Sequence, residues 1–376
     1  MKGVAKRCGK TDFVLLVSVI ALMLFGVVMV YSASSYSASV NYNNEYYYAV
    51  KQIIGVLLGV IVMIICSYID YHILIKLRFV ILAVSYILLV LVFVPGIGVE
   101  NYGAKRWINL PFFTIQASEI AKFGFIVFTA SYIAKNKKKM STLKGLLPIL
   151  LVGGSISVLI ILEPNMSITM CVVLLMLVML FLGGAKIKHF ALLVLPVAML
   201  VPVLIAIEPY RLKRLTAFLN PWDSPLSEGY QLIQSFYALG SGGLFGVGLF
   251  NSRQKYLFLP FSESDFIFSV IGEELGFFGC AIVMAVFLLI IFRAVKIAKN
   301  APDGFGCYLS SGIAALIAIQ VCINIAVVSG SIPPTGLPLP FVSAGSSSII
   351  VFCAAVGFLL GVKRFSHKSI ESLIRK

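Results

Sequence analysis

The sequence predicts an all-α integral membrane protein with ten transmembrane helices. The chain has 376 residues, of which 60% are hydrophobic and 12% are charged, and its mean hydropathy is +1.02. This composition is typical of a membrane protein and not of a soluble domain. A bilayer core about 30 Å thick needs roughly 20 apolar residues per helix. Ten stretches meet or approach that length: 13–32, 50–69, 73–94, 113–134, 146–162, 166–183, 189–207, 266–292, 308–329 and 341–362.

The boundaries of these stretches indicate how the helices follow one another. The first stretch comes after four basic residues, as in a signal peptide, but its length and the lack of a convincing cleavage site predict a retained helix. The weakest boundary is Glu163-Pro-Asn165, where a proline and two polar residues predict a tight turn between the fifth and sixth helices. No repeat or separate soluble segment interrupts the pattern, so residues 1–376 are expected to form a single polytopic membrane domain.

The basic residues predict the orientation of the helices. If both termini are cytoplasmic, 21 of the 30 Lys and Arg residues face the cytoplasm, together with only four acidic residues. Such an excess of Lys and Arg is typical of cytoplasmic loops. It accounts for the net charge of +15 without a nucleic-acid partner. The seven cysteines show no paired spacing, so neither disulfides nor a zinc site is predicted.

Two predicted outer loops are long enough to carry chemistry. Residues 95–112 include Arg106 beside a tryptophan, a pair that also fits a simple interfacial anchor. Residues 208–265 form a large extracytoplasmic loop between helices seven and eight. Cations beside a deep carboxylate suit a substrate that carries a diphosphate and a group requiring deprotonation. The cations of the longer loop that we consider are Arg211, Arg253 and Lys255.

The longer loop also contains two recognisable segments. Glu228–Leu239 has apolar residues at helical spacing, which predicts a helix lying at the membrane interface. The next segment, 240–248, is rich in glycine but follows no strand. A phosphate-binding loop is therefore only weakly indicated, and a flexible re-entrant turn is an equal alternative.

The eighth apolar stretch begins with three carboxylates. Asp265 lies at its mouth, and Glu273 and Glu274 follow two turns further in. A charge near the bilayer core costs several kcal/mol or requires a water-filled cavity, so such residues indicate a functional site by default. At about 1.5 Å per residue, Glu273 is expected roughly 12 Å below Asp265 and on nearly the same face. The alternative is a boundary acid in the headgroup region with a structural ion pair beneath it.

The fourth stretch opens with the polar residues Gln116, Glu119 and Lys122. Glu119 and Lys122 are three positions apart, which places them close enough to pair and to lower each other's cost of burial. The pair could serve a substrate, or it could be a structural ion pair that joins two helices. The sequence does not decide between these alternatives.

The last outer loop, 331–340, is rich in proline and is not expected to be helical. Non-helical backbone near a membrane should line a cavity, and Ser343 just after it would supply polar lining or close packing. Histidine chemistry and a His-based metal site are excluded from the outer face if the topology holds. The reason is that all three histidines fall on predicted cytoplasmic segments: His72, His189 and His367.

Seven short motifs follow one another along these helices and loops. They are Arg106-Trp-Ile, Ile115-Gln-Ala-Ser-Glu119 with Lys122, Tyr230-Gln-Leu-Ile-Gln-Ser235, Arg253-Gln-Lys255, Ser264-Asp-Phe-Ile-Phe268, Glu273-Glu-Leu-Gly276 and Thr335-Gly-Leu-Pro-Leu-Pro-Phe341. Any one motif is weak evidence, but the ordered set is very specific. Over essentially the whole chain, the sequence resembles the SEDS family (shape, elongation, division and sporulation; FtsW, RodA and SpoVE).

The resemblance implies a peptidoglycan glycosyltransferase. Such an enzyme polymerises lipid II, a disaccharide-pentapeptide on undecaprenyl diphosphate, at the outer face of the bacterial cytoplasmic membrane. It works with a class B penicillin-binding protein as transpeptidase. By resemblance, Asp265 would be the general base that activates an acceptor hydroxyl for one inverting displacement of the lipid diphosphate. The other residues expected to bind substrate or support the site are Arg106, Gln116, Glu119, Lys122, Arg211, Arg253, Lys255, Glu273, Glu274 and Ser343.

The sequence departs from the family pattern at two polar motifs and at Thr114, where some division members have Arg before the Ile-Gln motif. Glu163-Pro-Asn-Met-Ser167 stands where many members have Gln-Pro-Asp-Leu-Gly, and Ser343-Ala-Gly-Ser-Ser-Ser348 stands where Ser-Tyr-Gly-Gly-Ser-Ser is usual. None of these departures affects Asp265 or Glu119, but these polar positions cannot be carried over from the family. The details at Asn220-Pro-Trp222, Arg253-Gln-Lys255 and Ala301-Pro-Asp303 resemble the division and sporulation branch most closely.

Two other functions are alternatives at this point. A flippase that moves lipid II without chemistry would also use the buried pair, although a transporter site is expected near the midplane and Asp265 is expected at the outer surface. A scaffold that only recruits the transpeptidase is the weaker alternative. The sequence predicts no metal ligands. It leaves open whether Mg²⁺ or Mn²⁺ bridges the diphosphate, and whether the role is in division or in the spore cortex.

Overall fold

The computed structural model describes residues 11–101, 104–109, 114–191 and 209–374. Eight of the helices in this part of the chain are long and apolar enough to cross a membrane. They are α1 (Phe13–Tyr42), α2 (Tyr47–Tyr68), α3 (Ile73–Leu91), α4 (Ala117–Asn136), α5 (Leu143–Leu162), α10 (Ile267–Lys299), α11 (Gly304–Val328) and α12 (Ser346–Ile374). A ninth apolar helix, α6 (Met166–Leu182), is shorter. The helix predicted at 189–207 lies almost wholly outside the described residues, so the count of ten stays a prediction.

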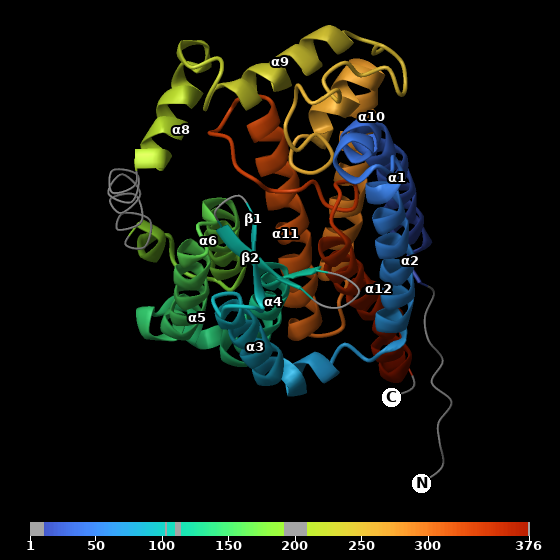
Figure 1. Cartoon of the computed structure of the whole chain (residues 1–376). Helices are drawn as coiled ribbons and strands as arrows, with labels where there is room; N and C mark the ends of the chain where they lie inside the picture. The colour runs from blue at the N-terminus through green and yellow to red at the C-terminus, as the bar shows by residue number, and fades with distance from the viewer. Residues whose placement is uncertain (1–10, 102–103, 110–113, 192–208, 375–376) are drawn as a thin grey trace.

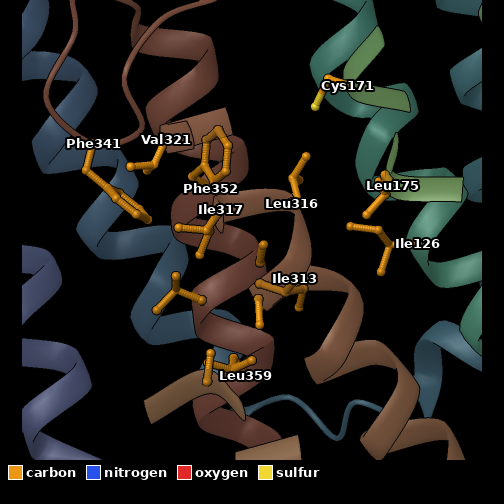
Figure 2. Close-up of a cluster of buried hydrophobic side chains, with 14 of the residues drawn as sticks. Ile126, Cys171, Leu175, Ile313, Leu316, Ile317, Val321, Phe341, Phe352 and Leu359 are labelled. Carbon is orange, nitrogen blue, oxygen red and sulfur yellow. The ribbon is translucent and has the colours of Figure 1, made fainter. Parts of the chain in front are cut away.

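Helix α11 occupies the centre of the bundle (Figure 1). It packs against α10, α4, α6 and α12, while α2 packs along α12 and α1 packs on α2 and α10. Figure 2 shows Ile313 and Leu316 of α11 between Phe352 of α12 on one side and Leu175 of α6 on the other. In lipid the hydrophobic effect does not favour helix association, so such close packing and interhelical hydrogen bonds hold the bundle together.

Outer helices of the bundle keep apolar side chains exposed. Leu57 of α2 and Phe79 of α3 are each 59% exposed, and Ile87 of α3 is 57% exposed. A soluble protein rarely presents so large an apolar surface. These side chains are the ones that would contact lipid, as expected for a multi-pass membrane protein.

The two ends of the bundle are fixed by polar contacts. At one end, Asp12 accepts hydrogen bonds from Arg293 late in α10, with a shortest distance of 2.5 Å. At the same end, the Tyr71 hydroxyl donates to Asp303 at 2.7 Å, joining the α2–α3 turn to the start of α11. Burial and this hydrogen bond raise the pKa of Tyr71. We call this the lysine-rich end, because these basic residues lie near it: Lys76, Lys135, Lys137, Lys138, Lys139, Lys144, Lys296 and Lys299.

A small sheet precedes α4, and the sequence reasoning missed it. Strands β1 (Gly98–Asn101), β2 (Ala104–Asn109) and β3 (Thr114–Gln116) pair antiparallel in that order. In this sheet Trp107 lies opposite Gln116. The predicted start of the fourth helix at 113 is therefore wrong, because Thr114–Gln116 is held in β3 and the helix begins at Ala117.

The predicted 208–265 loop contains two helices. These are α8 (Pro209–Leu219) and α9 (Tyr230–Gly242), joined by the short helix η2 (Pro221–Asp223). The predicted helix at 228–239 is thus confirmed as α9, which lies across the end of the bundle where α10 begins (Figure 1). That α9 rests on a membrane surface stays a prediction.

The glycine-rich segment 240–248 packs on a break in α10. Gly276 has φ 66° and ψ −166° inside that helix, which interrupts its hydrogen-bond ladder. Val247 N–H donates to Glu273 O at 2.9 Å, and Gly248 N–H donates to Glu274 O at 3.0 Å. A Cβ atom at Gly246 would lie 2.1 Å from Glu274 O, so only glycine permits this contact. At least two backbone N–H groups of the segment therefore donate to α10. A phosphate-binding loop would need such N–H groups for its ligand, so the contacts favour a packing role for this segment.

Candidate active site

Asp265 lies in the turn directly before α10 and is half-buried. Three successive carbonyl groups of this turn accept hydrogen bonds. Glu263 O accepts from Ala344 N–H at 2.9 Å, and Ser264 O accepts from the Ser343 hydroxyl at 2.5 Å. Asp265 O accepts from the Asn324 amide at 2.9 Å. The backbone of the turn is therefore held from two separate elements, α11 and the loop before α12.

The Asp265 carboxylate lies against Gly336 of the proline-rich loop. A Cβ atom at position 336 would be 2.8 Å from Asp265 Oδ2 and 3.7 Å from Cγ, so a larger residue there would displace the carboxylate. The Gly336 N–H donates to Ser167 Oγ at 3.0 Å. This bond brings the start of α6 beside Asp265, at the tight turn predicted around Glu163-Pro-Asn165.

Two amides of α11 hold the proline-rich loop, and the sequence reasoning did not single them out. Asn324 donates to Leu337 O at 2.7 Å as well as to Asp265 O, and Gln320 donates to Pro338 O at 3.0 Å. Both side chains are buried. The signal available in the sequence was two amides one helical turn apart in an otherwise apolar stretch, where a polar side chain needs a specific partner.

Glu119 and Lys122 form an ion pair deep in the bundle. Lys122 Nζ donates to Glu119 Oε1 at 2.7 Å and to Gln320 Oε1 at 2.8 Å, and it lies 5.7 Å from the centre of the Phe352 ring. Both charged side chains are almost completely buried. Through Gln320 the pair connects to the proline-rich loop, so its contacts fit the structural alternative and link it indirectly to the Asp265 turn.

Ser343 and Gln116 also lie in this polar network. The Ser343 hydroxyl accepts from Leu339 N–H at 2.8 Å while it donates to Ser264 O. Gln116 N–H donates to Ser347 Oγ at 3.4 Å, which ties the start of α4 to α12. Gln52 of α2, another amide that sequence reasoning missed, donates to Val342 O and Ser343 O.

The recorded side-chain hydrogen bonds of Glu273 and Glu274 go to the loop before Asp265 and to α1. Glu273 accepts from the Ser252 hydroxyl and from the N–H groups of Arg253 at 2.9 Å and Gln254 at 3.4 Å. Glu274 accepts from the Ser32 hydroxyl at 2.6 Å and from Ser252 N–H at 3.2 Å. The two carboxylates therefore bind residues 252–254 of the loop and anchor it to α1 and α10.

The prediction that the cations of the longer loop face outward is only partly correct. Lys255 is buried, and its Nζ lies 3.6 Å from Glu274 Oε1, because that buried carboxylate requires a nearby positive charge. Arg253 is exposed. Arg211 belongs to α8, but its side chain lies outside the described residues. Of the two cations at 253 and 255, Arg253 is therefore the one with an exposed side chain.

Arg106 reaches the turn between α5 and α6. Its guanidinium donates to Glu163 O at 3.4 Å and to Pro164 O at 2.5 Å. The Glu163 side chain is buried, and neither carboxylate oxygen has a hydrogen-bond partner among the described residues. Burial raises the pKa of Glu163 to about 8, and the charge of Arg106 opposes this rise. The fold therefore favours the protonated form of this carboxyl group.

Within the described ranges, no three His, Cys, Asp or Glu side chains group as metal ligands. A divalent cation near Asp265 would therefore need further oxygen ligands, and a bound diphosphate supplies such oxygens. The Asp265 carboxylate is a hard oxygen donor, so it fits Mg²⁺ or Mn²⁺ better than a softer metal.

Comparison with known proteins places the chain in a family. The family model described as cell cycle protein, which covers FtsW, RodA and SpoVE, matches residues 13–368. The stage V sporulation protein E of Bacillus subtilis is 40% identical over 357 residues, covering 95% of this chain and 98% of that protein. The probable peptidoglycan glycosyltransferase FtsW of Trichlorobacter lovleyi is 43% identical over 357 residues, covering 95% and 94%.

Two solved structures share the fold over almost the whole chain. A chain from a peptidoglycan synthase complex, described as coordinating polymerization and crosslinking, superposes with a TM-score of 0.79 at 26% identity. That match covers 95% of this chain and 99% of the other. The rod shape determining protein RodA of Thermus thermophilus superposes with a TM-score of 0.70 at 25% identity, covering 95% and 98%. This chain therefore belongs to the FtsW, RodA and SpoVE family of cell cycle proteins.

Proposed function

We propose that this protein is a peptidoglycan glycosyltransferase that polymerises lipid II into glycan strands. Membership of the family supports the activity, since relatives that match almost the whole chain carry that name. The structural observation that carries the assignment is the Asp265 turn. Three carbonyl groups fix its backbone, and a glycine leaves room for its carboxylate.

Asp265 is the proposed general base. Its carboxylate takes the proton of the acceptor sugar hydroxyl as that oxygen attacks the anomeric carbon of the donor. The bond from that carbon to the diphosphate oxygen breaks in the same step, and undecaprenyl diphosphate leaves with the bonding electrons. One displacement inverts the configuration, so one base suffices and no covalent enzyme intermediate is needed.

The rigid placement of the turn contributes to this chemistry. A base must lie within hydrogen-bonding reach of the proton that it removes, and a misplacement of about 1 Å can cost roughly 10²-fold in rate. Asn324 and Ser343 act as positioning residues in this scheme, because they hold the backbone of Asp265 and Ser264. Arg106 and Arg253 are the proposed cations for the diphosphate, with Arg211 as a third.

The Asp265 end of the bundle is proposed to face outward, with both chain termini in the cytoplasm. The concentration of Lys and Arg at the opposite end supports this orientation. Single cysteines at exposed positions Ser227 and Lys138, in a background without the native cysteines, test it in intact cells. An impermeant maleimide should label Ser227→Cys and not Lys138→Cys, and the reverse pattern would refute the orientation.

A class B penicillin-binding protein is the proposed partner. The solved relative from a peptidoglycan synthase complex, which coordinates polymerization with crosslinking, supports this pairing. The partner should co-purify with this protein from its own cells and raise its polymerase activity. Full activity alone, with no increase from any such partner, would contradict the proposal.

The decisive experiment compares wild type with Asp265→Asn in a purified lipid II polymerisation assay. The asparagine preserves shape and hydrogen bonding but cannot accept the proton, and removal of a general base typically costs about 10²–10⁴-fold. Glycan strands should fall below detection while the variant still reaches the membrane and binds its partner. Near wild-type polymerisation by Asp265→Asn would refute the catalytic role.

The polymerisation assay, together with the location of lipid II in cells, separates the enzyme from a flippase. A flippase would yield no polymer from purified wild-type protein, and its Asp265→Asn variant would leave lipid II in the inner leaflet of cells. An enzyme variant would instead leave lipid II accessible at the outer leaflet. A pure scaffold would yield no polymer and would not retain lipid II inside.

A further inference from the structure

A hollow with both polar and aromatic lining lies at the lysine-rich end, between α3 and α4. It has a volume of about 220 Å³, comparable to roughly seven water molecules at about 30 Å³ each. This is enough room for a phosphate group with its ester oxygens. The hollow is lined by Arg78, Phe79, Phe128, Ser131, Tyr132, Lys135 and Asn136.

Arg78 is the central cation of this hollow. Its Nη1 donates to Ile75 O at 3.0 Å and to Ser131 Oγ at 3.3 Å, and its guanidinium lies 4.6 Å from the centre of the Phe79 ring. These contacts hold the group in place yet use only one of its three nitrogens among the described residues. The remaining N–H donors are free to form the paired hydrogen bonds that guanidinium groups make with phosphate.

Among the described residues, no carboxylate forms an ion pair with Arg78 or Lys135. Helix α3 contains no acidic residue, and the only one on α4, Glu119, is paired with Lys122 deep in the bundle. Lys135 makes no ion pair with any described residue. Two acids of the same end of the bundle, Asp70 in the α2–α3 turn and Asp303 before α11, contact His72. The hollow is therefore a positively charged site without a protein counter-ion in the described structure.

The surface next to the hollow is apolar. Phe79 is 59% exposed and Val80 is 56% exposed on the same helix, and Leu77 beside Arg78 is 40% exposed. Helix α3 is also the least covered of the described membrane helices. A ligand that fills the hollow would thus have an anionic group beside Arg78 and Lys135 and an apolar portion along α3.

We propose that this hollow binds the phosphodiester head group of an anionic phospholipid, with an acyl chain along α3. Basic pockets between transmembrane helices are a known means of binding such head groups. Ser131, Tyr132 and Asn136 supply further hydrogen-bond donors to the phosphate or to the polar head group. A soluble anion would gain nothing from the exposed apolar face, so a lipid fits the whole surface. The inference does not depend on the reaction proposed above.

The test is native mass spectrometry of the purified full-length protein with phosphatidylglycerol or phosphatidylcholine of the same acyl chains. Wild type should retain phosphatidylglycerol preferentially. The variant Arg78→Gln with Lys135→Gln should lose that preference by about tenfold, since each cation near a membrane surface contributes attraction. The matched control, Lys137→Gln with Lys138→Gln, removes the same charge from exposed positions outside the hollow and should retain the preference. Equal losses in the two variants would overturn the site, because the attraction would then be a general effect of charge.

A second variant keeps both cations and fills the hollow. Ser131→Leu should reduce retained phosphatidylglycerol to the level of phosphatidylcholine, and it tests the site even if the Arg78 variant fails to fold. Undiminished binding by Ser131→Leu would overturn the proposal. So would complete displacement of the lipid by millimolar inorganic phosphate, since that would show a site for the free anion and not for a lipid.

Discussion

The Asp265 carboxylate lies in close contact with Gly336. A Cβ atom added at position 336 would be only 2.8 Å from Asp265 Oδ2. The Gly336 N–H is simultaneously bound to Ser167 Oγ at 3.0 Å, so the glycine cannot move away freely. The carboxylate proposed as the base thus has a position that depends on the smallest residue of the proline-rich loop.

Gly336→Ala should therefore impair catalysis without unfolding the protein. The added methyl group must displace the carboxylate by several tenths of an ångström, and we expect a loss of about tenfold to 10²-fold in polymerisation rate. Gly345→Ala, directly before α12, is the matched control, because the nearest atom of the described residues, apart from its two chain neighbours, would be 3.7 Å from the added Cβ. Equal rates for Gly336→Ala and Gly345→Ala would contradict the close contact.

Asn324→Ala should reduce the rate more than it reduces substrate affinity. The change leaves the carbonyl groups of Asp265 and Leu337 without their shared donor, which costs about 1–3 kcal/mol per unsatisfied buried group and loosens the turn. We expect kcat to fall at least about tenfold with KM little changed, measured on lipid II. Asn300→Ala removes an exposed amide whose one side-chain hydrogen bond among the described residues is to Lys296 O, and it should leave both constants unchanged.

The buried ion pair should behave non-additively. Lys122→Met leaves Glu119 as an uncompensated buried charge, for which about 3–5 kcal/mol of destabilisation is typical. The double variant Lys122→Met with Glu119→Gln removes that charge and should recover much of the stability. Thermal unfolding of the purified variants in one detergent measures this, and a double variant no more stable than Lys122→Met would argue against the pair.

Glu163 should make the stability of the protein depend on pH. Its pKa is 4.5 when unperturbed and about 8 in the fold, so between these values the unfolded chain releases a proton that the folded chain keeps. Stability should therefore fall as the pH rises from about 4.5 to 8, and then level off. Each pH unit contributes at most about 1.4 kcal/mol.

Glu163→Gln should remove that dependence. At pH 8.5 the variant should unfold at a higher temperature than wild type. At pH 5 the difference between the two unfolding temperatures should be smaller or absent. Glu45→Gln, at an exposed position, is the matched control and should follow wild type throughout. If the unfolding temperatures of wild type and Glu163→Gln change in parallel with pH across this range, the fold does not stabilise the protonated form of Glu163.

The helices could be predicted from the sequence because a bilayer imposes one simple rule. A backbone in hydrocarbon must satisfy its own hydrogen bonds, so runs of about 20 apolar residues become helices. Eight of the predicted stretches appear as membrane-length helices and a ninth as α6, with ends displaced where local structure intervenes. The motif order was likewise sufficient to indicate the family, and Asp265, Glu119 and Lys122 stood out as charges in apolar surroundings.

Only the tertiary structure decided what those polar residues contact. Glu273 appeared to belong with Asp265, because helical spacing places the two on nearly the same face, but loop residues 252–255 bind Glu273 and its neighbour Glu274. Asn324 appeared unremarkable, yet it joins Asp265 to the proline-rich loop. The physical reason is that helical periodicity is local, whereas a buried polar group is satisfied by whichever distant segment the fold brings within about 3 Å.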